Sequence, residues 1–185
     1  MVIKRRRVIR REAADVSDAG QHVGDAQKLA IEAGERAPGF DLPTAGGGRA
    51  RLADFKGKPV VVYFYPKDDT PGCTKEAQGF AEAYPAFQAA GIAAVGISKD
   101  SAASHDRFKA KYDLPSMLAS DEHGGGVEAY GCRVEKSMYG KSYMGVDRST
   151  FLIDAGGKVR KVWRKVKVPG HVAEVLATAH ALNAP

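Results

Sequence analysis

The sequence predicts one α/β domain in which a central mixed β-sheet is flanked by helices on both faces. Two observations carry this prediction. Short runs of β-branched and aromatic residues alternate with longer stretches in which apolar residues recur at spacings of three and four. Near the C-terminus, two strand-like runs follow one another across a Gly-rich turn, and a last helical pattern comes after them. Alternating units predict parallel strands, and the turn adds an antiparallel pair.

The charge of the chain divides it into an extension and a domain. The formal net charge of the 185 residues is +6, and the first eleven residues hold six basic side chains and no acid. Removing these six from the 28 Lys and Arg residues leaves 22, equal to the 22 Asp and Glu. We therefore expect residues 1–35 to be a solvated, largely disordered extension, and residues 36–185 to form the domain.

Composition also excludes several classes of protein. A neutral domain with one basic cluster gives no reason to expect nucleic-acid binding, and the apolar runs are too short to span a membrane. The two cysteines, Cys73 and Cys132, lie far apart, which argues against a disulfide scaffold and a paired-cysteine metal site. The five histidines have no spacing typical of metal ligands. Sparse cysteine is consistent with a reducing compartment, so we expect a cytoplasmic protein.

The first predicted elements lead into a buried strand. Residues 37–59 are interrupted by Pro and Gly, which predicts a loop with short β pieces and a hairpin turn at Gly46–Gly48. The run PVVVYFY, over residues 59–65, predicts a buried central strand. Apolar residues from Thr74 to Gly91 then have helical spacing, and Gly91 stands where a C-terminal cap belongs, although Pro85 strains this helix.

The rest of the chain continues the alternation. It predicts a buried strand, a helix, a short strand and a short helix, over residues 92–98, 101–112, 116–120 and 126–131. Two strands over residues 149–154 and 158–163 are joined by a Gly-Gly turn typical of a hairpin. The apolar stripe from Val172 to Leu182 predicts a last helix. A hairpin and a helix after βαβ units form the thioredoxin-like arrangement.

The candidate site centres on Cys73, which is placed between the central strand and the helix that follows it. A structural cysteine is usually buried among apolar residues, whereas this one lies in the polar stretch PKDDTPGCTKEA of residues 66–77. Free N–H groups and the helix dipole favour an anion at this position, here a thiolate. Because an unperturbed thiol is mostly protonated at pH 7, we expect a nearby cation, and the candidate is Arg148. A turn could also bring the Thr70 hydroxyl to the sulfur.

The same residues resemble a known family. Pro66, Thr70 and Cys73 form the pattern PxxxTxxC, the active-site signature of peroxiredoxins. The stretches VYFYPKDDTPGCTKEA (residues 62–77) and SMYGKSYMGVDRSTFLIDAGGKV (residues 137–159) resemble the bacterioferritin comigratory protein or PrxQ subfamily. The resemblance runs through the predicted domain, leaves out the extension, and implies the thioredoxin-like fold.

The resemblance implies a role for each candidate residue. Cys73 would be the peroxidatic cysteine, which attacks the O–O bond of hydrogen peroxide or an organic hydroperoxide and becomes a sulfenic acid. Thr70 would hydrogen-bond the peroxide, Pro66 would shield the pocket, and Arg148 would hold the thiolate and the developing charge. Glu76 would have a supporting role. No cofactor is implied, the reductant would be thioredoxin, glutaredoxin or a low-molecular-weight thiol, and a monomer is expected.

The sequence departs from the family at the second, resolving cysteine. The two positions at which relatives carry it hold Gln78 and Lys109 here. The only other thiol is Cys132. Either Cys132 is a small buried hydrophobic residue and the enzyme has a one-cysteine cycle, or Cys132 resolves Cys73 through a disulfide within one subunit or between two. The sequence leaves both open.

Three other functions are alternatives to this one. A disulfide oxidoreductase needs a CxxC pair, and Glu76 occupies the second position of that pattern. A cysteine hydrolase needs a histidine base, and no histidine lies in a segment predicted to adjoin Cys73. A non-enzymatic redox sensor that binds a partner through the basic extension is the third.

Overall fold

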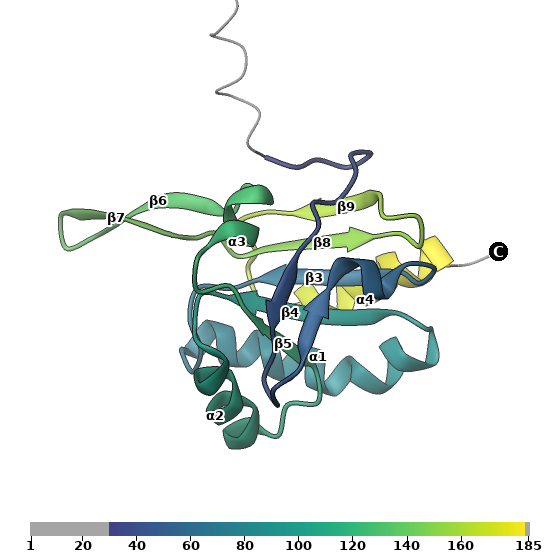
Figure 1. Ribbon diagram of the computed structural model, residues 1–185, viewed down its shortest axis with the longest axis horizontal. Helices are drawn as coiled ribbons and strands as arrows, with labels where there is room; N and C mark the ends of the chain where they lie inside the picture. The colour runs from purple at the N-terminus through teal and green to yellow at the C-terminus, as the bar shows by residue number, and fades with distance from the viewer. Residues whose placement is uncertain (1–29, 184–185) are drawn as a thin grey trace, which may run out of the picture.

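A five-stranded mixed sheet forms the centre of the computed structural model, which describes residues 30–183. The strand order is β5-β4-β3-β8-β9 (Figure 1). Strands β3 (Val60–Phe64), β4 (Ala93–Ser98) and β5 (Met117–Ser120) are parallel. Strand β8 (Ser149–Ile153) runs antiparallel to both β3 and β9 (Val159–Trp163). The predicted α/β, thioredoxin-like sheet is confirmed.

Helices cover both faces of this sheet, as predicted. Helices α1 (Pro71–Ala89), α2 (Ala102–Tyr112) and α4 (His171–Asn183) contribute residues to one apolar cluster, and α3 (Gly125–Ala129) contributes to the other. The side chains of β3 alternate between the two clusters, because successive residues of a strand point to opposite faces. The sheet is therefore buried on both sides, which explains why β3 is apolar throughout.

The N-terminal part of the domain covers the α3 face. Strands β1 (Asp41–Pro43) and β2 (Arg49–Arg51) form a small antiparallel sheet, followed by the 3-10 helix η2 (Leu52–Phe55). The predicted turn is confirmed, since Gly46 and Gly47 have positive φ angles between these strands.

Hydrogen bonds join the domain to the chain from Ile31 onward, upstream of the expected domain start at residue 36. The Gly34 amide donates to the Val159 carbonyl at 2.7 Å, and the Val159 amide donates to the Glu35 carbonyl at 2.9 Å. Arg164 Nη2 donates to the Ile31 carbonyl at 2.9 Å. Residues 1–29, where most of the predicted extension falls, lie outside the described residues. No helix within residues 30–183 is long and apolar enough to cross a membrane.

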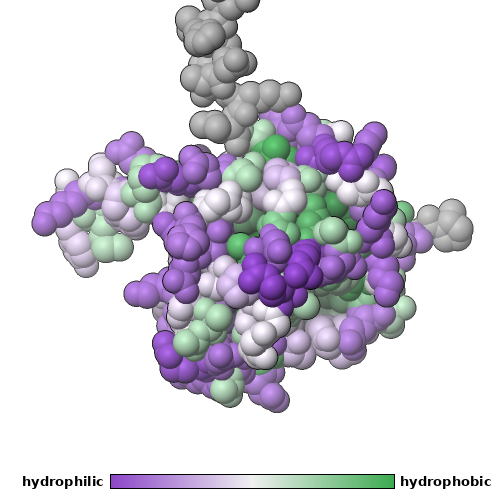
Figure 2. Space-filling view, in the orientation of Figure 1, coloured by the Kyte–Doolittle hydropathy of each residue, from purple (hydrophilic) through white to green (hydrophobic). Residues whose placement is uncertain are grey.

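A projecting hairpin is the main element that the sequence analysis does not predict. Strands β6 (Arg133–Met138) and β7 (Lys141–Val146) pair only with each other and extend away from the body (Figure 1). Tyr139 and Gly140 form the turn with positive φ angles of 51° and 75°. Apolar and polar side chains lie side by side on this hairpin (Figure 2). Because most of its residues are exposed, it lacks the buried apolar run that identifies the other strands.

Candidate active site

Cys73 lies in the first turn of α1, because this helix begins three residues earlier than predicted. The helix begins at Pro71 rather than at Thr74, and Thr70 is its N-cap residue with an extended backbone. Proline suits this first position because its φ is already helical and no N–H is needed there. Cys73 is only 2% exposed. Its sulfur therefore lies at the positive end of the helix dipole, beside backbone N–H groups without helical partners.

Arg148 reaches Cys73 because of the antiparallel register of β3 and β8. Phe64, the last residue of β3, pairs with Ser149, the first of β8, so the residue before β8 lies beside the end of β3. Arg148 Nη2 donates to Cys73 Sγ at 3.2 Å. A Cβ at Gly72 would lie 3.1 Å from the same nitrogen, so glycine leaves the guanidinium room to approach the helix. The cation expected from the sequence is in direct contact with the thiol.

Glu76 binds the other side of the same guanidinium. Arg148 Nη1 donates to Glu76 Oε2, and Glu76 is fully buried. Within the described chain, Glu76 Oε1 has no hydrogen-bond partner. Burial raises the pKa of Glu76 to about 7, although the adjacent guanidinium acts in the opposite direction. Burial alone would lower the pKa of Arg148, but Glu76 and Cys73 together raise it, so the guanidinium stays charged.

Pro66 and Thr70 belong to the loop that joins β3 to α1. Pro66 is half-buried directly after Tyr65, which follows the last residue of β3. The Thr70 hydroxyl donates to the Lys67 carbonyl at 2.8 Å, within the same loop. The fold thus brings Pro66, Thr70, Cys73, Glu76 and Arg148 to one end of the central strand.

Cys132 lies on the opposite face of the sheet from Cys73. It is fully buried in the cluster that contains Tyr130 and Phe151, whereas Cys73 belongs to the cluster that contains Tyr63. Both thiols are free. Burial raises the pKa of the Cys132 thiol to about 11, which disfavours the nucleophilic thiolate. The structure therefore does not bring the two cysteines together.

The sequence did not predict a buried pair of polar side chains that joins the loop between β3 and α1 to helix α2. Asp68 and His105 are both buried, and their side chains meet with Nδ1 and Oδ2 2.7 Å apart. The signal for His105 is its spacing of three residues before Phe108, which places both on the inner face of α2. No signal connects either residue with the other, because they are 37 positions apart.

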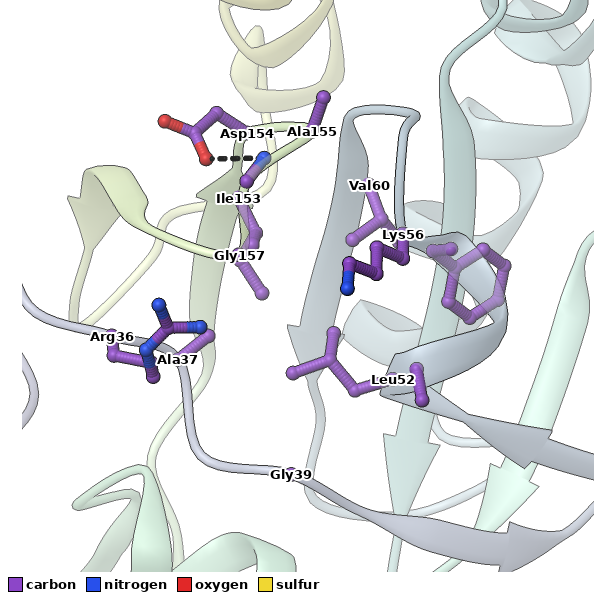
Figure 3. Close-up of a pocket in the computed structure, with 13 residues that line it drawn as sticks. Arg36, Ala37, Gly39, Leu52, Lys56, Val60, Ile153, Asp154, Ala155 and Gly157 are labelled. Atoms are coloured by element: carbon purple, nitrogen blue, oxygen red, sulfur yellow. Dashed lines mark hydrogen bonds between the residues drawn. The ribbon is translucent and has the colours of Figure 1, made fainter.

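A separate hollow lies at the opposite end of β3 from Cys73 (Figure 3). Its volume is about 280 Å³, and Leu52 and Val60 contribute to its lining. Arg36 and Lys56 reach over it from two sides. Since Val60 begins β3 and the active-site loop follows the end of that strand, the hollow has no part in the thiol chemistry. Within residues 30–183, no group of three or more His, Cys, Asp or Glu residues is arranged to hold a metal ion.

The fold and the site together define a class of protein. A thioredoxin-like sheet carries one cysteine in the first turn of the helix after its central strand, and an arginine from an antiparallel neighbour donates to the sulfur. This is the arrangement that the sequence resemblance implies for thiol peroxidases of the peroxiredoxin type.

Comparison with known proteins gives the family. Residues 33–162 match the model of the AhpC/TSA family. The chain is 53% identical to a putative peroxiredoxin bcp of Coxiella burnetii over 80% of this chain and 98% of that protein. It is 46% identical to peroxiredoxin Bcp of Bacillus subtilis over 81% of this chain and 96% of that one. A solved structure of the Xanthomonas campestris bacterioferritin comigratory protein has a TM-score of 0.75 and 43% identity, covering 78% and 92% of the two chains.

The chain therefore belongs to the AhpC/TSA family, as a peroxiredoxin of the Bcp or PrxQ type that reduces hydroperoxides.

Proposed function

We propose that Cys73 is the peroxidatic cysteine and that the enzyme works through a one-cysteine cycle, with an external thiol as reductant. The observation that carries the proposal is the 3.2 Å hydrogen bond from Arg148 Nη2 to Cys73 Sγ. In the described chain, Cys73 is also the only cysteine at a helix N-terminus. The five proposed site residues come from one chain, so the chemistry needs no second subunit.

The proposed reaction transfers one oxygen atom to sulfur. The Cys73 thiolate attacks the terminal oxygen of the hydroperoxide, an S–O bond forms, and the O–O bond breaks. The leaving oxygen takes a proton and departs as water or an alcohol, so the peroxide is reduced by two electrons and the thiolate becomes a sulfenic acid. In this proposal, Arg148 stabilises the charge as it moves from sulfur to the leaving oxygen, and its hydrogen bond to Cys73 supports that role.

The active-site loop supplies the remaining contacts in this proposal. The Thr70 hydroxyl donates its hydrogen bond to the Lys67 carbonyl, so its oxygen can accept a hydrogen bond from the peroxide O–H. Pro66 adds an apolar wall without an unsatisfied N–H. We infer hydrogen peroxide and alkyl hydroperoxides as substrates, since the Xanthomonas campestris relative is described for its alkyl peroxide reduction activity.

The proposed cycle closes with two external thiols. The first attacks the Cys73 sulfenic acid, which forms a mixed disulfide and releases water. The second attacks the mixed disulfide, releases Cys73 as a thiolate and leaves an oxidised thiol pair. Thioredoxin, glutaredoxin and low-molecular-weight thiols all have this chemistry. A supply of reduced thiols is typical of the cytoplasm, where we expect the enzyme to act.

The two-cysteine alternative requires Cys132 to reach Cys73. A disulfide needs Cα atoms within about 7 Å of each other, and the two cysteines belong to clusters on opposite faces of the sheet. A bridge between them would therefore require the first turn of α1 and the buried Cys132 segment to leave the core together. This observation favours the one-cysteine cycle.

Intact-mass analysis tests the proposal directly. The wild type, Cys132→Ser and Cys73→Ser are each treated with one equivalent of hydrogen peroxide, with and without dimedone. We expect a dimedone adduct on Cys73 in the first two proteins and none in Cys73→Ser. Cys132→Ser should keep the wild-type rate of peroxide consumption with dithiothreitol.

Two results would contradict the proposal in different ways. A loss of two mass units confined to the wild type, with the adduct only in Cys132→Ser, would make Cys132 the resolving thiol. An unmodified Cys73 in every protein would remove its peroxidatic role.

A further inference from the structure

The loop that carries Pro66 and Thr70 is held from behind by helix α2. The Asp68 carboxylate is the centre of this attachment. Its Oδ2 lies 2.7 Å from His105 Nδ1 and accepts from Ser104 Oγ at 2.8 Å. Its Oδ1 accepts from the Tyr65 hydroxyl at 2.7 Å. Asp68 is 8% exposed and His105 is fully buried, so these bonds form out of contact with bulk water.

Asp68 and His105 form a buried side-chain hydrogen bond, with Oδ2 and Nδ1 2.7 Å apart. His105 Nε2 lies 3.1 Å from the Ala119 carbonyl oxygen, which can only accept, so Nε2 carries a proton. Burial alone would raise the pKa of Asp68, but hydrogen bonds from His105, Tyr65 and Ser104 hold it below its usual value. The imidazole ring is therefore held at both nitrogens, between the loop and β5.

The next residue of the loop has its own attachment to α2. The Asp69 carboxylate accepts from Lys111 Nζ at 2.7 Å and from the Tyr112 hydroxyl at 2.5 Å. Its backbone is left-handed, with φ of 55°, so the chain reverses direction between the two attachments. The Asp68 amide donates to Asp100 Oδ2 at 3.0 Å, which fixes the backbone as well.

The backbone of Thr70 is fixed to α1, because its carbonyl accepts from the Thr74 amide at 2.8 Å. Its hydroxyl instead donates to the Lys67 carbonyl, inside the loop. The direction of the Thr70 hydroxyl relative to Cys73 therefore depends on how firmly Asp68 and Asp69 hold the loop. Of those two, Asp69 is exposed and Asp68 is buried, so Asp68 carries the attachment that solvent screens least.

We infer that Asp68 and His105 are positioning residues for peroxide reduction, which hold the Thr70 loop in register with Cys73 and Arg148. The inference rests on the proposed function of Cys73. Neither residue touches the sulfur in the structure, so each acts through the loop. A buried polar pair adds little to stability over a well-packed apolar pair, whereas a misplacement of about 1 Å in a catalytic group costs up to roughly 100-fold in rate.

The test weakens the Asp68 attachment while keeping the shape of the side chain. In Asp68→Asn, the amide oxygen can still accept from Tyr65, whereas the amide nitrogen replaces Oδ2 and cannot accept from Ser104 or His105. Tyr65→Phe removes one hydroxyl from Asp68. Tyr130→Phe is the matched control, because it removes one hydroxyl, bonded to the Pro38 carbonyl at 2.7 Å, on the opposite face of the sheet.

Three quantities are measured on each protein: the second-order rate constant for Cys73 oxidation by hydrogen peroxide, the rate of Cys73 alkylation by iodoacetamide, and amide hydrogen exchange of residues 67–74. For Asp68→Asn we expect oxidation to slow by about 10- to 100-fold. We expect an intermediate slowing for Tyr65→Phe and a change within about twofold for Tyr130→Phe. Exchange should accelerate in the first two proteins only. Alkylation needs no peroxide contacts, so its rate should not fall with the oxidation rate.

The outcomes separate this inference from the proposed function. Equal oxidation rates in Asp68→Asn, Tyr65→Phe and Tyr130→Phe would overturn the positioning role, even if the first two melt at lower temperature. A parallel fall in oxidation and alkylation would also overturn it, because the effect would then be on the thiol itself. If Asp68→Asn does not fold, Tyr65→Phe and Ser104→Ala decide the question. A wild type whose Cys73 does not react with peroxide refutes the proposed function instead.

Discussion

Arg148 serves two partners at once in the active site. Its guanidinium donates to Cys73 through one nitrogen and to Glu76 through another. A guanidinium suits this task because its donors are fixed in one plane, whereas a lysine ammonium is a point charge on a flexible stem. Glu76 orients the cation, and the cation in turn partly offsets the cost of burying a carboxylate. Among residues 30–183, the second oxygen of Glu76 has no hydrogen-bond partner.

The buried carboxylate makes stability depend on pH in a predictable direction. Burial raises the pKa of Glu76 from 4.5 to about 7. Between these values the folded protein holds a proton that the unfolded chain has lost, so the contribution of Glu76 to the free energy of unfolding falls as the pH rises. We expect the wild type to lose stability relative to Glu76→Gln between pH 4.5 and 7, by up to about 3 kcal/mol. Urea unfolding of both proteins at pH 5 and pH 8 measures this.

The exposed Glu82, on the same helix, provides the control for that experiment. Glu82→Gln removes an equal charge from α1 without a buried carboxylate. Its stability relative to the wild type should hardly change between the two pH values. A wild-type minus Glu76→Gln difference that is constant or increases with pH would contradict the raised pKa.

At the scale of elements, the projecting hairpin is the least supported part of the described chain. Strands β6 and β7 form a two-stranded sheet without a third strand, and such hairpins are marginally stable on their own. The turn adds strain, because Tyr139 has a left-handed backbone with φ of 51°. Asn and Gly are the residues preferred in turns of this kind, and the second position is already Gly140.

Replacing the strained tyrosine should stabilise the hairpin. We expect Tyr139→Asn to slow amide exchange in β6 and β7 by about threefold or more, equivalent to roughly 0.7 kcal/mol or more. The rate of peroxide consumption should stay the same, because the turn is remote from Cys73 in the fold. Tyr143→Asn is the matched control: it makes the same change within a strand, where Asn is disfavoured, and should speed exchange. Faster exchange in both variants would contradict the turn-strain argument.

The elements also show what the sequence could and could not predict. Strands β3, β4 and β8 were predictable because each is a buried apolar run, and α1 because its inner residues have helical spacing. The hairpin was not, since its strands are mostly exposed. Cys73 and Arg148 could be proposed because a thiolate at a helix N-terminus needs a nearby cation, and because the surrounding residues resemble those of peroxiredoxins. The Asp68–His105 pair could not, because its members meet only when α2 packs beside the loop.

At the scale of the whole molecule, residues 31–36 are part of the folded unit. Ile31 packs against the cluster on the α3 face, and Arg36 forms an isolated β-bridge with Lys158. Together with the backbone bonds to Val159, these contacts add an edge to the sheet beside β9. None of these contacts involves a proposed site residue, so we expect the segment to contribute to stability and not to the reaction.

Two truncations test this division. Removal of residues 2–29 should leave both the peroxide rate and the free energy of unfolding unchanged. Removal of residues 2–36 should lower the free energy of unfolding by about 2 kcal/mol, through the lost apolar burial and hydrogen bonds. The peroxide rate of the folded fraction should be retained. Chemical denaturation of the three proteins measures the difference, and equal stability of both truncations would show that the contacts are dispensable.

The separation of Cys73 and Cys132 by the sheet has a consequence for how the enzyme is inactivated. In the one-cysteine cycle proposed above, no thiol within the fold competes for the sulfenic acid, so its lifetime is set by the supply of thiols outside. When that supply falls, a second peroxide can oxidise the same sulfur to a sulfinic acid, which ordinary thiols do not reverse. The fraction of enzyme with a Cys73 sulfinic acid then rises with the ratio of peroxide to reducing thiol. Cys132, on the opposite face of the sheet, stays reduced.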